Sequence, residues 1–244
     1  MFPLRDTVPG RRPAVVVWAL VFLNTLVFLH ETQLAGSPLQ QFLNQYALVP
    51  AHLTAPGGLA QYWPTLFTSM FLHGGWMHII GNMWFLWIFG DNVEDRFGNL
   101  GFLVLYLVGG LAAGALEIFA DPHSTVPSLG ASGAIAAVLG AYLVLYPTAR
   151  VITFIPIFFF PWIVSIPAVV WLGIWFLEQW LSGVAVLQEH AATGGVAYWA
   201  HVGGFVFGLL VALPLRWSGT PPAGQPVPGN HPYYPGYDRG WPFA

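Results

Sequence analysis

The chain has 244 residues, of which 56% are hydrophobic and only 7% are charged, whereas a soluble domain carries about 25% charged residues. So few charges cannot cover the surface of a soluble fold of this size, and the composition therefore indicates an integral membrane protein. The sequence contains no cysteine, which excludes a disulfide framework, a cysteine-ligated metal and a thiol nucleophile. The net charge of −3, without a cluster of basic residues, argues against a nucleic-acid partner.

Six apolar segments follow one another along the chain, and each is long enough for a membrane-spanning helix of about 17–25 residues. We therefore expect an all-α membrane protein built as a bundle of six transmembrane helices. The first segment has a basic flank like that of a cleaved signal peptide, but its apolar core is longer than the usual stretch of about 7–15 residues. The predicted spans are residues 14–31, 76–92, 100–120, 130–147, 159–181 and 195–215.

The seven arginines indicate how these spans are oriented. With six spans every arginine falls on one side, and the loops on the opposite side (residues 32–75, 121–129 and 182–194) contain none. Positively charged residues stay in the cytoplasm, so both termini are predicted to be cytoplasmic.

This threading divides the chain into three parts. Residues 1–13 form a cytoplasmic N-terminal segment, and residues 14–215 form the six-span domain. The tail, residues 216–244, is rich in proline and glycine and has no apolar periodicity. We expect this cytoplasmic tail to be disordered.

Two reactive side chains lie inside apolar segments. Ser132 begins the fourth predicted span within GASG at residues 130–133, and His201 lies near the start of the sixth within AHVGG at residues 200–204. Polar groups at membrane depth are costly and mark functional sites. Together with His78 of the second span, they lie within about 10 Å of the outer ends of their helices. All three side chains can therefore share one layer.

Small residues recur at every fourth position on the fourth and sixth spans, which lets two helix backbones approach closely. The Ser132 hydroxyl and the His201 imidazole could then come within hydrogen-bond distance. In that arrangement the imidazole takes the serine proton as general base and later protonates the leaving amine. The small positions are Ser132, Gly133, Ala136 and Gly140 on the fourth span and Ala200, Gly204 and Gly208 on the sixth.

Hydrogen-bond donors for a developing negative charge are predicted beside the serine. His78 and Asn82 lie four residues apart, on one helix face, and both side chains can donate hydrogen bonds. Ser132 lies near a helix N-terminus, where N–H groups are free. These donors would form an oxyanion hole. Gly130 and Gly133 leave room for a substrate backbone as well as for close helix packing.

No carboxylate is placed by the sequence to orient His201. Glu117 and Glu178 lie in the third and fifth spans, but nothing ties either of them to the histidine. We therefore predict a Ser–His dyad rather than a triad, a variant recognised by geometry and roles.

These motifs, in this order on a six-span chain, resemble the rhomboid family of intramembrane serine proteases. The resemblance covers about residues 14–215. Besides GASG and AHVGG, the similar stretches are HGGWMHIIGN at residues 73–82 and DNVEDRFG at residues 91–98.

The resemblance implies Ser132 as nucleophile and His201 as base, with His78, Asn82 and the Ser132 amide as oxyanion donors. It also implies that transmembrane protein substrates are cut near their outer ends, at small residues, without a metal or other cofactor. The chain looks like the minimal prokaryotic form, which would place it in the cell membrane, surrounded by lipid. The sequence does not indicate an oligomeric state.

Some family members carry a tyrosine four residues after the serine, where it packs on the histidine. Ala136 occupies that position here, so another group must hold His201, and Tyr142 and Tyr198 are the candidates. His73 precedes the second span, and we expect it to stabilise the outer loop.

Three other functions were weighed against proteolysis. A transporter or channel is disfavoured because the polar groups gather at one depth, whereas an ion pathway would carry them across the membrane. A metalloprotease is disfavoured because HExxH is absent. A relative that binds membrane proteins without cutting them is disfavoured because both Ser132 and His201 are present.

Hydrolysis needs water at membrane depth, so we predict a polar cavity open to the outside and lined by the four candidate catalytic and oxyanion side chains. A substrate helix must also enter this cavity from the side. Pro156, Pro161 and Pro167 suggest a loosely packed fifth span that could serve as this entrance.

Overall fold

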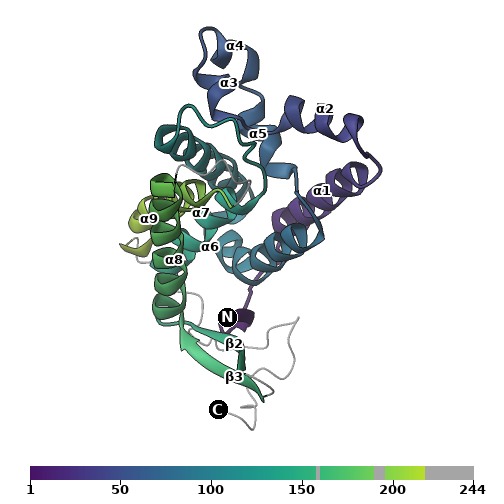
Figure 1. The fold of residues 1–244 in the computed structure, drawn as a ribbon. Helices are drawn as coiled ribbons and strands as arrows, with labels where there is room; N and C mark the ends of the chain where they lie inside the picture. Colours follow the sequence, from purple (N-terminus) through teal and green to yellow (C-terminus); the bar gives the residue numbers. More distant parts are fainter. Residues whose placement is uncertain (158–159, 190–195, 218–244) are drawn as a thin grey trace.

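The computed structural model describes residues 1–157, 160–189 and 196–217, which form a helical bundle with a small sheet at one end (Figure 1). The short helices of the loop that follows α1 lie at the other end of the bundle. The five longer helices are α1 (Val15–Glu31), α6 (Trp76–Ala120), α7 (Ser132–Leu145), α8 (Ala168–Glu189) and α9 (Tyr198–Trp217). The short ones are α2 (Ser37–Tyr46), α3 (Pro50–Thr54), α4 (Gly58–Tyr62), α5 (Thr65–Thr68) and the 3₁₀ helix η1 (Ser69–Phe71).

Three helices of the described chain are long and apolar enough to cross a membrane: α6, most of α8 (Ala168–Leu187) and most of α9 (Tyr198–Arg216). Helices α1 and α7 are apolar but shorter. The protein is therefore a mostly helical membrane protein with several apolar helices. The number of crossings and the side on which the termini lie remain predictions.

Helix α6 covers both the second and the third predicted spans. The helix continues beyond residue 92, where the second predicted span ends, but it is interrupted two residues before the predicted start of the third span at residue 100. The break is confined to Gly98, whose φ of 69° and ψ of 165° are not helical. Glycine tolerates this positive φ because it has no Cβ, so a single residue divides the 45-residue helix.

The expectation of an all-α fold is wrong, because the chain also forms a three-stranded antiparallel sheet in the order β1–β2–β3. Its strands are β1 (Phe2–Asp6), β2 (Arg150–Ile157) and β3 (Phe160–Pro167). Strand β3 occupies the beginning of the predicted fifth span, and α8 starts only at Ala168. An apolar run this short is compatible with a strand or a helix. Its β-branched residues favour the strand, and its prolines disfavour the interior of a helix.

The three prolines that suggested a loose fifth span lie in the strands of this sheet and not in α8. Pro156 pairs with Pro161 across β2 and β3, and Pro167 is the last residue of β3. The argument that they loosen the fifth span is therefore wrong. The predicted disordered tail begins at residue 216, but α9 continues to Trp217, and residues 218–244 lie outside the described residues.

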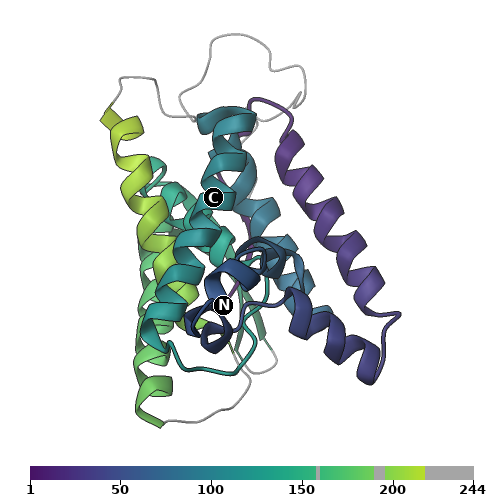
Figure 2. The same cartoon turned by 90° about the horizontal axis from the view of Figure 1, so that it is seen from above.

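Helix α7 lies at the centre of the bundle and supplies most of the buried core. All ten residues from Gly133 to Tyr142 are buried, and α7 packs on α6 and α9. Seen from above, α9 and α1 lie on opposite sides of the molecule with α6 between them (Figure 2). The first residue of α7 is Ser132, so the candidate nucleophile sits at the end of the most buried helix.

The N-terminal strand is fastened to the bundle through a buried carboxyl group. Asp6 accepts a hydrogen bond from the Asn92 amide at 2.8 Å and another from the Tyr142 hydroxyl. Burial raises the pKa of Asp6 to about 7, although the bond from Tyr142 acts in the opposite direction. The segment at residues 1–13 thus contains a strand that docks on α6 and α7.

We expect Asp6→Asn to reduce the dependence of stability on pH. Because the folded-state pKa of Asp6 is raised, the folded chain binds more protons than the unfolded chain between about pH 4 and pH 7. The stabilisation is complete below about pH 4 and is lost as the pH rises through 7. Asparagine keeps an acceptor oxygen but does not titrate. The thermal unfolding midpoint in detergent should fall less between pH 5 and pH 8 in the variant than in the wild type.

The control for this prediction is Asp121→Asn, which changes an exposed carboxylate at the end of α6. It should leave the pH dependence of the midpoint at its wild-type value. An equal fall in the midpoint for wild type and Asp6→Asn would show that the Asp6 carboxyl does not titrate on unfolding.

Candidate active site

A cavity of about 750 Å³ opens between the start of α6, the loop before α7 and the facing sides of α8 and α9. His78, Asn82, Ser132 and His201 all line it, together with apolar side chains such as Trp175. The structure therefore brings to one cavity the four polar residues that the sequence placed on three separate spans. The cavity's lining is mostly apolar with a few polar groups, as is common for ligand sites.

Ser132 is held by the loop that leads into α7. A two-way backbone bridge joins Leu48 to Ser128, with N···O distances of 3.0 and 2.7 Å. The Gly130 amide donates a hydrogen bond of 2.8 Å to the Ser69 carbonyl oxygen. The segment before α7 is thus tied to the loop of short helices. As the first residue of α7, Ser132 has an N–H without an intrahelical acceptor.

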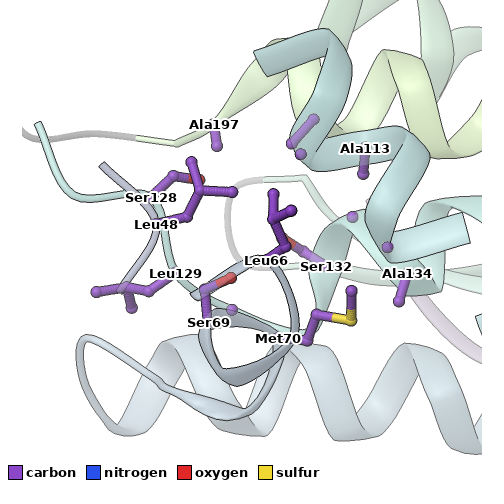
Figure 3. Close-up of a pocket in the computed structure, with 15 residues that line it drawn as sticks. Leu48, Leu66, Ser69, Met70, Ala113, Ser128, Leu129, Ser132, Ala134 and Ala197 are labelled. Carbon is purple, nitrogen blue, oxygen red and sulfur yellow. The ribbon is translucent and has the colours of Figure 1, made fainter. Parts of the chain in front are cut away.

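A second, smaller cavity of about 30 Å³ lies on the other side of Ser132. Figure 3 shows Leu66, Met70 and Ala134 around the serine in this cavity. This volume is large enough to hold a water molecule or a small group. Ser132 borders both cavities, so a group bound at the serine could extend into either one.

His201 is fixed by two side chains of α8. Its Nδ1 lies 2.7 Å from the Oε1 atom of Gln179, and its ring packs on Trp175 with a centroid distance of 5.8 Å. His201 is 8% exposed, and its Nε2 is buried without a hydrogen-bond partner among the described residues. A general base needs a free nitrogen that faces the reacting groups. His201 lines the cavity, and its Nε2 has no other partner among the described residues.

The start of α9 is held by a carboxylate from α6. Glu117 Oε2 accepts a hydrogen bond of 2.9 Å from the Ala200 N–H, one of the free donors of a helix N-terminus. A negative charge at this end of a helix is also favourable for the helix dipole. Glu117 therefore fixes the backbone of the residue that precedes His201.

Two hydrogen-bond donors lie beside Gly130. The Gly74 N–H donates to His78 Nδ1 at 3.3 Å, so a neutral His78 carries its proton on Nε2. A Cβ built on Gly130 would lie 2.7 Å from His78 Nε2 and 3.5 Å from Asn82 Nδ2. The Asn82 Nδ2 is buried without a partner among the described residues. The absence of a side chain at Gly130 therefore keeps the space next to these two donors open.

His73 lies next to His78, which lines the cavity. Its N–H donates to the Glu31 carboxylate at 3.1 Å, and its ring lies 5.1 Å from the ring of His78. Burial, and to a smaller extent the nearby His78, lowers the pKa of His73 to about 4. His73 is thus neutral at pH 7, and its backbone connects the segment before α6 to the end of α1.

Helices α7 and α9 approach so closely that no side chain fits between them at three points: Gly204 and Gly208 of α9, and Gly140 of α7, where a Cβ would lie 2.0 Å from the Phe205 carbonyl oxygen. A Cβ on Gly204 would lie 2.0 Å from the Gly133 carbonyl oxygen, and one on Gly208 would lie 1.8 Å from the Ala137 carbonyl oxygen. Real Cβ atoms do not come within 3.0 Å of such atoms. The glycines therefore set the spacing between the helix of Ser132 and the helix of His201.

Comparison with known proteins identifies the family. A family model described as a Rhomboid domain matches residues 60–218, which is well over half of the chain. The chain belongs to the rhomboid family. The resemblance noted in the sequence is thus confirmed, and the protein is an integral, multi-pass membrane protein.

Rhomboid relatives come from several kinds of membrane. The mitochondrial Rhomboid protein 1 of Saccharomyces cerevisiae is 28% identical over 204 residues, which cover 81% of this chain and 52% of the relative. The chloroplastic Rhomboid-like protein 11 of Arabidopsis thaliana is 40% identical over 129 residues, covering 52% of this chain and 40% of the relative. The Rhomboid protease GluP of Bacillus subtilis is 40% identical over 81 residues, covering 33% and 15%.

This rhomboid spans about half or less of the length of these relatives. Because they include mitochondrial, chloroplast and bacterial proteins, the comparisons do not show in which membrane this chain resides. A prokaryotic cell membrane remains a prediction.

Two residues that contact His201, Gln179 and Trp175, were not identified in the sequence. Glu117 was considered there, but its bond to the Ala200 N–H was not predicted. In the described part of the chain, the side chain of His201 contacts Gln179 and Trp175 and neither of the two tyrosines proposed to hold it. The Tyr142 hydroxyl instead donates a hydrogen bond to Asp6. The sequence did contain an indication of this support, because Trp175 and Gln179 lie four residues apart on one face of an apolar helix. An amide side chain buried on such a helix needs a hydrogen-bond partner.

Proposed function

We propose that this rhomboid is an intramembrane serine endopeptidase that uses Ser132 as nucleophile and His201 as general base. The observation that carries the proposal is the single cavity lined by Ser132, His201, His78 and Asn82 between apolar helices. In the proposed reaction the Ser132 hydroxyl attacks a peptide carbonyl while His201 Nε2 takes its proton. The same imidazole then returns the proton to the leaving amine, and water hydrolyses the acyl-enzyme.

The oxyanion of the tetrahedral intermediate would be stabilised by His78 Nε2–H, the Asn82 amide and the Ser132 N–H. Support comes from the clustering of the first two donors beside Gly130 and from the position of Ser132 at a helix start. Donors already in place cost no reorganisation when charge develops, and removal of one typically lowers turnover by about 10²–10³.

The substrates that we propose are transmembrane proteins with a small residue at the cleaved bond. The apolar surroundings of the site favour substrates that reside in the bilayer. The cavity of about 30 Å³ beside Ser132 is far smaller than the main cavity of about 750 Å³, which favours a small group there. A bulky side chain at the cut would have to displace Met70 or Leu66.

The test is labelling of the purified protein in detergent with a fluorophosphonate probe, which reacts with activated serines. Wild type should be labelled, whereas Ser132→Ala and His201→Ala should each lose labelling by at least about 10²-fold. Ser128→Ala is the matched control, because this serine lines the same cavity and has no proposed role in catalysis. It should be labelled at the wild-type rate.

Each variant must first give the wild-type unfolding midpoint, so that loss of labelling reports chemistry. Cleavage of a transmembrane peptide in vesicles, followed by mass spectrometry of the products, then locates the cut. A folded wild type that neither reacts nor cleaves would contradict the proposal and favour a relative that binds membrane proteins without cutting them.

A further inference from the structure

Gln179 is a buried amide on a helix that is otherwise apolar. Its side chain is 6% exposed, and α8 has long enough an apolar stretch to cross a membrane. Burial of an amide is unfavourable unless its polar atoms are hydrogen-bonded. Here Oε1 lies 2.7 Å from His201 Nδ1, so the polar atom that burial would penalise is paired with the candidate base.

We propose that Gln179 is the positioning residue of the site, which fixes the tautomer and direction of the His201 ring. This inference rests on the proposed protease function. It assigns the orienting role, which a carboxylate fills in a Ser–His–Asp triad, to a neutral amide supplied by α8.

The tautomer follows from the chemistry of the two atoms. With the amide oxygen facing the ring, as in this structure, Gln179 accepts a hydrogen bond, and Nδ1 of His201 carries the proton that is donated. In a neutral imidazole, Nε2 then holds the lone pair. That Nε2 is the atom left buried without a partner among the described residues. Gln179 thereby leaves the basic nitrogen free for the proton of Ser132.

The direction of the ring follows from a second contact on the same helix. Trp175 lies one turn before Gln179 and packs on the imidazole with the ring planes tilted by 32°. Gln179 therefore holds one edge of the ring while Trp175 covers a face. Together with Glu117 at the Ala200 N–H, these contacts fix the side chain of His201 and the backbone of the residue before it.

A neutral partner suits a site between apolar helices. An ionised carboxylate in the place of Gln179 would have to lose its hydration, which costs several kcal/mol in a protein interior and is unfavourable at membrane depth. An amide provides the same acceptor atom without that penalty. The preceding residue in the chain, Glu178, is exposed on the surface of α8.

The experiment compares three variants with wild type. Gln179→Met keeps the size of the side chain but removes the acceptor, Gln179→Glu keeps an acceptor, and Glu178→Gln is the matched control on the exposed face.

The first measurement is kcat and KM for a transmembrane peptide in vesicles. Gln179→Met should lower kcat by about 10-fold or more, the loss expected for one hydrogen bond of about 1.4 kcal/mol, and should leave KM within about 2-fold. Gln179→Glu should restore most of kcat, and Glu178→Gln should match wild type.

The second measurement is the ¹⁵N spectrum of histidine-labelled protein at pH 8, with the His201 signals assigned by their loss in His201→Ala. We expect the Nδ1–H tautomer in wild type and in Gln179→Glu, and a mixture or the Nε2–H tautomer in Gln179→Met. This readout does not depend on catalysis. A merely structural role for Gln179 would change stability but not the proton position.

The outcomes separate this inference from the function on which it rests. A wild type that cleaves, with Gln179→Met giving the wild-type kcat, would overturn the role of Gln179 and leave the protease function standing. A wild type that does not cleave contradicts the function, and the spectrum still tests the Gln179–His201 bond. Should Gln179→Met fail to fold, an Nε2–H tautomer in wild type alone would overturn the inference.

Discussion

Gly208→Ala is expected to prevent α9 from packing on α7 and to destabilise the whole bundle. The new Cβ would lie 1.8 Å from the Ala137 carbonyl oxygen and 2.6 Å from its carbon. Both are backbone atoms of the most buried helix, so no side-chain rotation can relieve the contact. Overpacking a core usually costs about 1–3 kcal/mol. A clash with backbone should lie at or above the upper end of that range, because the two helices must separate.

The measurement is the thermal unfolding midpoint in detergent, together with the yield of monodisperse protein. Gly173→Ala is the matched control, since it makes the same substitution on α8 with no atom within 4 Å of the new Cβ. Alanine favours helix over glycine by about 1 kcal/mol, so this control should be neutral or slightly stabilised. A wild-type midpoint for Gly208→Ala would contradict the close approach of α7 and α9.

The close approach of these helices could be anticipated because it depends on a local pattern. Small residues at every fourth position lie on one helix face whatever the rest of the chain does, and glycine there has few uses other than close packing. The clustering of the four polar residues in one cavity could also be anticipated from local sequence. Their positions near the ends of apolar segments fix their depth, provided that the segments are helical.

The sheet was not anticipated because the residues of β3 belong to an apolar run that continues without a break into α8. The first part of this run is a strand that pairs with β2, the segment just before it in the chain. The docking of β1 on the bundle is non-local: Asp6 is bonded to Asn92 and Tyr142, far along the chain. Composition marked residues 1–13 only as a basic flank.

The support of His201 was missed because a neutral amide was not expected in the orienting role. The predicted partners were Tyr142 and Tyr198, after the carboxylates of Glu117 and Glu178 showed no tie to the histidine. The structure instead uses an amide on α8. Trp175 and Gln179 lie four residues apart on one face of this helix, and both fall inside the predicted fifth span of residues 159–181. The wrong start of that span therefore did not conceal the pair.

Gly130→Ala should abolish most of the proposed turnover while leaving the protein folded. At this position φ is +123°, a conformation that alanine rarely adopts. The added Cβ would lie 2.7 Å from His78 Nε2 and 2.8 Å from its Cε1. The imidazole must therefore move away from the point where the oxyanion would form. Loss of one such donor lowers turnover by about 10²–10³, and we expect kcat to fall within or beyond that range.

The clash and the backbone strain can be separated with a second glycine. Gly36 also has a positive φ, of 58°, but a Cβ there has no atom within 4 Å, so Gly36→Ala introduces strain without displacing a donor. Both variants should lose a similar, modest amount of stability, of about 1–3 kcal/mol, and only Gly130→Ala should lose turnover. Equal losses of turnover in the two variants would trace the effect to strain in general. Normal turnover in Gly130→Ala would show that His78 does not contact the developing oxyanion, which would leave Asn82 and the Ser132 N–H as its donors.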